Sequence, residues 1–239
     1  MENGYAYETS TAIYFDISKL DKYPILSNLD VENQKAGARV EIDTEKRNPQ
    51  DFALWIKAPE NHLMKWDSPW GPSYPGWHIE CSAMGQKYLG EQFDIHTGGI
   101  DLIPTHHENE IAQSKGKCGK IPARYWLHGE YLLINGGKMS KSLGNVYLVK
   151  DIKEKGFDPI VYKLFSYSCH YRNKLNFTWE GIEAASKSLE RLRNSYKMNL
   201  NGTDALTAHD KEKLSQIEES FHKAINDDLN MPLAMSFVW

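Results

Sequence analysis

Apolar residues recur at steps of three and four along two long segments in the second half of the chain. In the first segment these positions run from Ile182 to Tyr196, and in the second they run from Leu214 to Ile225. This spacing places them on one face of an α-helix, so the pattern predicts two amphipathic helices separated by the polar stretch 199–205. Because the chain stops on apolar residues, we expect it to end inside a larger helical domain.

The N-terminal part of the chain carries a different pattern, in which apolar and polar residues alternate over short segments. This alternation at 12–16 and at 39–43 predicts two half-buried strands. Three prolines and two glycines lie within 67–77, a density that excludes regular structure and marks a rigid loop or a domain boundary. The pattern over 77–88, after this loop, is typical of a helix.

The middle of the chain alternates between apolar segments and loops. Residues 93–95 predict a buried strand that ends in the glycine-containing loop 96–99. Thr105 and Glu108 have the spacing of a helix capping box. Residues 131–134 predict a further buried strand, and the succession of strand, loop, helix and strand predicts an α/β fold with a parallel sheet.

Composition narrows the class of protein without identifying a function. The 239 residues are 41% apolar and 25% charged, which excludes a disordered chain and fits one large domain or two small ones. No apolar stretch is long enough to span a membrane, and the first residues lack a signal-peptide pattern, so we expect a cytoplasmic protein. The net charge of −4 excludes a globally basic nucleic-acid-binding protein, and three cysteines are too few for a disulfide framework.

The first candidate site combines Cys81 with residues of the string HHENE. His106 and Glu110 are four residues apart and therefore share one helix face, whereas His107 lies about 100° round the helix and would not share their metal. Thiolate, imidazole and carboxylate together suit Zn²⁺. Cys118 is a possible fourth ligand, although its Lys/Gly-rich surroundings favour a solvated thiol in a loop. The alternative is a polar helix face beside a buried structural cysteine.

The second candidate site is the string GGKMSKSLGN at 136–145, which follows a turn signal at 135–137. Lys138 and Lys141, with serines and glycines around them, form a flexible cationic loop that can place ammonium groups and hydroxyls on a triphosphate. The loop is not a P-loop, because the pattern G-x-x-x-x-G-K-[ST] is absent. The alternative is a solvated surface loop.

A third, weaker signal is the string HTGGID after the strand predicted at 93–95. Gly98 and Gly99 permit close approach of a ligand to the backbone, and Asp101 can accept hydrogen bonds from ribose hydroxyls. A plain tight turn explains the same residues equally well.

The string CHYR at 169–172 carries a fourth signal. Cys169 and His170 are adjacent, so their side chains diverge and do not form a nucleophile and base. Tyr171 and Arg172 are better suited to packing and to contact with phosphate groups.

Several of these strings resemble those of one enzyme family, the cysteinyl-tRNA synthetases. They stand in that family's order along the chain: GWHIECSAM at 76–84, HTGGIDL at 96–102, HHENEIAQS at 106–114, KMSKSLGN at 138–145 and HYRNKLNF at 170–177. GARVEIDTEKRNPQDFALW in the N-terminal part resembles an insertion of the same family. KMSKS alone indicates any class I synthetase, whereas HHENE with WHIECSAM narrows the resemblance to the cysteine enzymes and their ligase relatives.

The resemblance implies an α/β fold, namely the second half of a Rossmann-type class I catalytic domain with a connective insertion. On this basis 1–75 is the connective insertion, and 76–147 is the second half of the nucleotide-binding domain with its KMSKS loop. Residues 148–200 are a stem-contact region, and 201–239 begin a helical bundle that is cut short.

The resemblance also implies one zinc ion held by Cys81, His106 and Glu110, with the family's fourth ligand, a more N-terminal cysteine, missing from this chain. In the family, zinc binds the thiolate of the substrate cysteine. Serine is rejected because its hydroxyl is a harder and far less acidic ligand. This discrimination makes a separate editing site unnecessary.

The implied reaction is ATP-dependent activation of L-cysteine followed by transfer to tRNA(Cys). Lys138 and Lys141 would stabilise the phosphorus during adenylate formation, with Lys141 contacting ATP, which is accompanied by Mg²⁺. Trp77 and His96 would line the pocket for cysteine and its adenylate. The residues implied to cradle the adenosine are Gly98, Gly99 and Asp101.

The chain departs from the family in one respect, since no His-x-Gly-His string occurs in it. The family carries that string, HIGH, together with the first zinc cysteine in the N-terminal half of its catalytic domain. We therefore expect this chain to be part of a larger enzyme, or a truncated gene product, and to be unable to activate cysteine alone. The alternatives are a ligase that joins activated cysteine to an amino-sugar, which the long helical extension disfavours, and a non-catalytic truncated paralogue that binds RNA.

Overall fold

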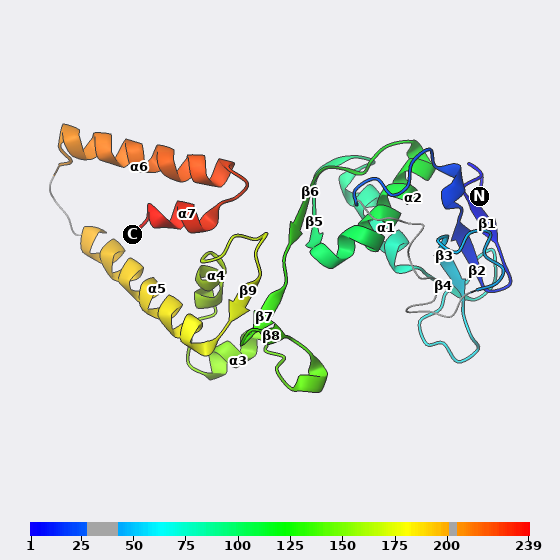
Figure 1. Ribbon diagram of the computed structural model, residues 1–239, viewed down its shortest axis with the longest axis horizontal. Helices are drawn as coiled ribbons and strands as arrows, with labels where there is room; N and C mark the ends of the chain where they lie inside the picture. The colour runs from blue at the N-terminus through cyan, green and yellow to red at the C-terminus, as the bar shows by residue number, and fades with distance from the viewer. Residues whose placement is uncertain (28–42, 201–204) are drawn as a thin grey trace. The chain divides into compact units, whose positions relative to one another are not determined.

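The computed structural model describes residues 1–27, 43–200 and 205–239. They form two compact units, Met1–His128 and Gly129–Trp239, which are described separately (Figure 1). The strand predicted at 39–43 lies outside the described residues except for its last position. The four functional segments inferred from the resemblance stay predictions, because the compact units reflect packing and not function.

The first unit begins with a four-stranded antiparallel sheet in the order β1–β2–β3–β4. The strands are β1 (Ala6–Glu8), β2 (Ala12–Phe15), β3 (Phe52–Lys57) and β4 (Ser73–Pro75). β2 confirms the strand predicted at 12–16, but it is buried at all four positions because apolar clusters cover both of its faces. The expectation that 67–77 has no regular structure is wrong at β4, an edge strand in which a proline is tolerated.

The sheet is followed by α1 (Trp77–Leu89), which confirms the helix predicted at 77–88, and by a two-stranded sheet of β5 (Phe93–Gly99) and β6 (Ala123–Gly129). The predicted loop at 96–99 is wrong, because β5 continues through these residues. Its two glycines lie where a neighbouring side chain would crowd a Cβ atom, as the site geometry below shows.

Between β5 and β6 the chain forms a 3-10 helix (Ile100–Leu102), a π-helical turn (Ile103–His107) and α2 (Glu108–Cys118). The predicted capping box is wrong, since Thr105 lies inside the π-helical turn. The carboxylate of Glu108 instead accepts hydrogen bonds from the backbone N–H groups of three residues far away in sequence. These are Ile25 at 2.7 Å, Leu26 at 2.5 Å and Ser27.

The second unit contains β7 (Leu132–Ile134), β8 (Gly137–Lys138) and β9 (Leu175–Phe177) in the order β8–β7–β9. β7 confirms the strand predicted at 131–134, and its pairing with β9 is parallel. The helices are α3 (Val149–Glu154), α4 (Ile160–Ser166), α5 (Trp179–Leu200), α6 (Ala208–Asn226) and α7 (Met231–Ser236). α5 and α6 confirm the two amphipathic helices, and the core of the unit is formed by Ile134, Ile152, Val161, Phe165, Phe177 and Ile182.

No helix among the described residues combines the length and the apolar character needed to cross a bilayer.

Candidate active site

Helix α1 brings Trp77 and Cys81 to one face, because they are four residues apart. The start of the helix is held against β3 by Gly76. Its backbone N–H donates to the Leu54 carbonyl at 2.9 Å, and a Cβ atom on Gly76 would collide with the Ala53 carbonyl oxygen. Glycine at this position therefore allows the first turn of α1 to lie close to β3.

The string HHENEIAQS lies at the end of the π-helical turn and the start of α2. All nine of its residues, 106–114, are buried, although seven of them are polar or charged. A solvated helix face, the alternative considered above, would be exposed on one side. A buried polar segment that starts in a π-helical turn is instead typical of a functional site.

Cys81, His106 and Glu110 converge on one point in the first unit. Their candidate ligand atoms all lie within 4.8 Å of one another, and His106 Nε2 lies 3.0 Å from Glu110 Oε1. His106 and Glu110 are buried, and Cys81 is partly buried. One thiol, one imidazole and one carboxylate form a donor set that fits a zinc ion.

Four further imidazoles surround this donor set, and the sequence patterns singled out none of them as part of a connected cluster. His78 Nδ1 lies 2.8 Å from His106 Nδ1, and His107 Nδ1 lies 2.7 Å from His128 Nε2. His96 Nε2 lies 3.2 Å from Glu110 Oε2. Two histidines, His96 and His106, therefore contact the buried carboxylate of Glu110, and three more of the chain's nine histidines contact these or each other.

Burial favours the neutral form of three of these imidazoles, those of His78, His106 and His107. It lowers the pKa of His78 to about 4, and the neighbouring His106 contributes to this shift. It also lowers the pKa of His107 to about 3, with contributions from His96, His128 and His106. The pKa of His106 is lowered by burial, against the opposing influence of Glu110. Neutral imidazoles are the form that binds metal ions.

Burial moves the pKa of the Cys81 thiol in the opposite direction, and it likewise favours the neutral form. The pKa of Cys81 is raised, first by burial and then by the negative charges of Glu110 and Glu80. The thiol is therefore protonated at neutral pH without a cation beside it, and binding of a metal ion must release that proton.

Two tryptophans flank the cluster. The Trp77 ring centroid lies 4.2 Å from that of His106, and the Trp77 side chain is 58% exposed. Trp126 lies 4.8 Å from His96 and 5.1 Å from His107, measured between ring centroids. Trp126 and His128 are two residues apart on β6 and so share a face of that strand. The alternation within the string YWLHG is the signal in the sequence that relates these two residues.

Gly98 and Gly99 lie at the end of β5, directly before the turn that contains Asp101. A Cβ atom on Gly98 would lie 2.6 Å from His107 Cε1, and one on Gly99 would collide with the Asp101 carboxylate. These contacts explain both glycines by packing within the protein, and Asp101 itself is exposed.

The string KMSKSLGN lies in the second unit, where β7 and β8 form a hairpin. Asn135 and Gly136 both have positive φ, at 49° and 77°, which confirms the predicted turn. Asn145 closes the loop, because its Nδ2 donates to the Lys138 carbonyl at 2.9 Å and its Oδ1 accepts from the Ser140 N–H at 2.8 Å. Lys138 and Lys141 are exposed, and neither forms an ion pair with any residue that the structure describes.

Residues 170–172 converge on Asp228, in the turn between α6 and α7. The Tyr171 hydroxyl donates to Asp228 Oδ1 at 2.6 Å, and Arg172 Nε donates to Oδ2 at 2.5 Å. Hydrogen bonds from Arg172 and Tyr171 hold the pKa of Asp228 at about 2. Both side chains that the sequence assigned to packing or phosphate contact are therefore engaged within the unit.

Two other cysteines lie away from the donor set. Cys118 is the last residue of α2, so the expectation that it lies in a loop is wrong, and its Sγ lies 3.2 Å from the Ser114 carbonyl oxygen. Cys169 contacts only backbone carbonyl groups near its own position among the described residues.

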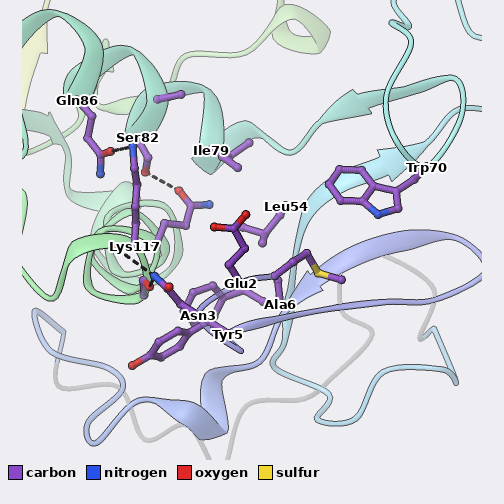
Figure 2. A pocket seen from close by; sticks show the side chains of 15 residues that line it. Glu2, Asn3, Tyr5, Ala6, Leu54, Trp70, Ile79, Ser82, Gln86 and Lys117 are labelled. Carbon is purple, nitrogen blue, oxygen red and sulfur yellow. Dashed lines mark hydrogen bonds between the residues drawn. The ribbon is translucent and has the colours of Figure 1, made fainter.

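The first unit also contains a hollow of about 540 Å³, shown in Figure 2. It lies among Leu54, Trp70, Ile79 and the residues that precede β1, with Asn3 Nδ2 donating to the Gly116 carbonyl at 2.9 Å. None of the site residues predicted from the sequence lines it.

Comparison with known proteins identifies the family. Residues 1–187 match the family of class I (C) tRNA synthetase catalytic domains. Cysteine–tRNA ligases of Treponema denticola and Carboxydothermus hydrogenoformans are 46% and 48% identical to this chain over 98% and 99% of its length, and the chain covers 52% and 51% of theirs. The chain thus spans about half the length of the curated relatives it matches.

A solved LeuRS from Agrobacterium radiobacter, in a ternary complex with tRNA and LeuAMS, has a similar fold. The match has a TM-score of 0.53 at 19% identity and covers 73% of this chain and 28% of that one. The architecture, the buried Cys81–His106–Glu110 cluster and the family match agree: the chain belongs to the class I (C) tRNA synthetase catalytic domains.

Proposed function

We propose that this chain forms part of a cysteine–tRNA ligase, which activates L-cysteine with ATP and transfers it to tRNA(Cys). The observation that carries the proposal is the convergence of Cys81, His106 and Glu110 in a buried cluster. The chain would supply the second half of a Rossmann-type catalytic domain, preceded by a connective insertion. We also propose that the protein acts in the cytoplasm.

Cys81, His106 and Glu110 would hold one zinc ion, with a further ligand from a part of the enzyme outside this sequence. When bound, the zinc would supply a soft Lewis acid to which the thiolate of cysteine, but not the hydroxyl of serine, can bind. The chain's own contribution is to keep the imidazole of His106 neutral and to hold Glu110 3.0 Å from it.

Trp77 and His96 would line the pocket for cysteine and its adenylate. Trp77 supports this role because it lies against His106 and yet is more than half exposed, so that its ring can cover a small substrate. His96 contacts Glu110 directly. The residues proposed to approach the adenosine are Gly98, Gly99 and Asp101.

Lys138 and Lys141 would stabilise the negative charge that develops on the phosphates of ATP, which Mg²⁺ accompanies. Both ammonium groups are exposed, and Asn145 ties the two ends of their loop together. A loop held in this way can present both charges to a triphosphate with little loss of conformational freedom on binding. In the second unit, residues 148–200 would contact the tRNA stem, and 201–239 would begin a helical bundle.

The chain by itself is proposed to be inactive, because it carries three of the four zinc ligands that the family uses and no HIGH string. Cysteine-dependent ATP–pyrophosphate exchange tests this directly, and exchange above background by the isolated 239-residue polypeptide would contradict it.

The cysteine–tRNA ligase assignment itself is tested by completing the catalytic domain. The N-terminal part of the catalytic domain of the Treponema denticola relative is fused before Met1, and exchange is measured with cysteine and with serine. We expect exchange with cysteine alone, and its loss in Cys81→Ala and Lys141→Ala. A folded, zinc-loaded fusion that shows no exchange, or equal exchange with serine, would contradict the assignment.

A further inference from the structure

A second set of potential metal ligands lies beside the first. The proposed function assigns no metal ion to this set. His96, His107 and Glu110 each place a nitrogen or an oxygen so that the three atoms lie within 4.8 Å of one another. His107 and Glu110 are buried, and His96 is partly buried. Glu110 belongs to both sets, whereas the second set contains no sulfur.

The groups of the second set are oriented toward one another. His96 Nε2 lies 3.3 Å from Oε1 and 3.2 Å from Oε2 of Glu110, so it faces the whole carboxylate. His107 directs its Nδ1 to His128 Nε2 at 2.7 Å, which leaves its Nε2 as the ligand atom and fixes the plane of the ring. A hydrogen bond from the second ring nitrogen is the usual companion of a histidine that binds a metal ion.

The backbone beside His107 leaves space next to its Nε2, although the residue is buried. A Cβ atom at position 98 would lie 2.9 Å from this nitrogen, and glycine is the residue that keeps this space clear. The Trp126 ring lies against both imidazoles and shields them from water on that side.

We propose that His96, His107 and Glu110 form a second position for a divalent transition-metal ion, which shares Glu110 with the position that contains Cys81. Two imidazoles and a carboxylate bind Zn²⁺, Co²⁺ or Fe²⁺ and leave coordination positions open. The first position, with its thiolate, favours thiophilic ions, whereas the second position accepts an ion without any thiolate. Removal of the Cys81 sulfur therefore weakens metal binding but does not abolish it.

Cobalt provides the probe, since Co²⁺ bound to a thiolate gives an intense charge-transfer band that Co²⁺ bound to nitrogen and oxygen does not. The metal-free chain is titrated with Co²⁺ as wild type, as Cys81→Ser and as Cys81→Ser/His96→Gln. We expect the band in the wild type, and Co²⁺ binding without the band in Cys81→Ser. The added His96→Gln should weaken that binding by roughly 10-fold or more, the size of loss that even outer-sphere changes produce.

The matched control is Cys81→Ser/His222→Gln, because His222 lies on α6 with a side chain that is 63% exposed. It should bind Co²⁺ as Cys81→Ser does. Absence of Co²⁺ binding in folded Cys81→Ser, or equal affinity with and without His96→Gln, would overturn the second position. A missing charge-transfer band in the wild type would instead contradict the zinc position of the proposed function.

If the double variant does not fold, NMR spectroscopy of Cys81→Ser with bound Co²⁺ still tests the proposal. In this protein, bound Co²⁺ should displace the NMR signals of the His96 and His107 imidazoles strongly. Displacement of the His78 and His106 signals without those of His96 and His107 would place the ion elsewhere and overturn the proposal.

Discussion

Both ring nitrogens of His106 already have a partner within the protein. Nδ1 lies 2.8 Å from His78 Nδ1, and Nε2 lies 3.0 Å from Glu110 Oε1. A zinc ion bound through Nε2 requires that nitrogen to carry no hydrogen, so the hydrogen must reside on Nδ1 and point to His78. His78 must then accept it and carry its own hydrogen on Nε2. His78 thereby determines which tautomer His106 adopts.

Zinc retention should separate the ligands from their neighbours. After dialysis against a competing chelator, bound zinc should fall in Cys81→Ala, His106→Ala and Glu110→Ala, and His78→Ala should weaken zinc binding about 10- to 100-fold through loss of the tautomer control. His107→Ala should retain the zinc ion at the position that contains Cys81 and lose only zinc bound at the second position, because His107 belongs to the second donor set alone. Loss of zinc from both positions in His107→Ala would show that the two sets are not distinct.

The sequence predicted which residues of this site come together only where they lie on one helix. His106 and Glu110 follow from a spacing of four residues, which holds across the change from π-helical to α-helical geometry. His96 and His128 come from two neighbouring strands, and no spacing along the sequence relates strands that are brought together by a crossover. The clustering of five imidazoles is therefore a property of tertiary structure.

At the scale of elements, most helices and strands followed from periodicity, and the errors arose where a tertiary contact replaced a local one. The spacing of Thr105 and Glu108 has the form of a capping box, but the Glu108 carboxylate is used by the backbone of residues 25–27. The glycines at 98 and 99 indicate a loop by local rules, yet both lie in β5. They are glycines because the side chains of His107 and Asp101 occupy the space that a Cβ atom would need.

Glu108 should therefore contribute more to stability than a helix cap does. Glu108→Gln replaces a buried carboxylate that accepts three N–H groups, and charge-assisted hydrogen bonds of this kind predict a loss of about 2–4 kcal/mol in the free energy of unfolding. Urea denaturation followed by circular dichroism measures it.

The matched control is Glu91→Gln, since Glu91 pairs with Lys120 at an exposed position and should change stability by less than about 1 kcal/mol. If Glu108→Gln were no more destabilising than this control, the carboxylate would not hold residues 25–27 as described.

The turn between α6 and α7 depends on a similar contact at the surface. Asp228 receives hydrogen bonds from Tyr171 and Arg172 and has a positive φ of 52°. Asp228→Ala should increase amide hydrogen exchange in α6 and α7 while leaving exchange in α3 and α4 unchanged. Asp227→Ala, one residue earlier and outside this contact, is the control, and equal exchange in both variants would argue against the role of Asp228.

At the scale of the molecule, the chemical groups are distributed over two compact units. The donor cluster belongs to Met1–His128, and the lysine loop belongs to Gly129–Trp239. The family match ends at residue 187, so it includes the whole first unit and part of the second. Composition and charge gave no indication of this division, because neither quantity depends on which segments pack together.

The metal-free chain should lose stability as the pH falls below about 6.5, the ordinary pKa of histidine. The pKa values of His78 and His107 are lowered in the folded chain to about 4 and about 3, so between pH 6.5 and these values protons bind to the unfolded chain and not to the folded one. Each histidine should reduce the free energy of unfolding by about 1.4 kcal/mol for each unit of pH in that range.

Urea denaturation at several pH values would measure this slope. His78→Gln should reduce the slope, whereas His222→Gln, at an exposed position on α6, should leave it unchanged. A stability that does not vary between pH 6.5 and pH 4.5 would show that these imidazoles take up protons in the folded state.

Contacts on two sides fix the orientation of helix α2. Glu110 faces the histidines, while Glu108 and Asn109 form hydrogen bonds with residues 23–27. Both sets of contacts would be lost if the helix rotated about its axis. Loss of one residue from the preceding turn would rotate it by about 100°. A deletion of one codon in this turn would therefore disrupt the metal-binding cluster and the attachment of residues 23–27 at the same time. We expect the length of this turn to vary less during evolution than the identity of its residues.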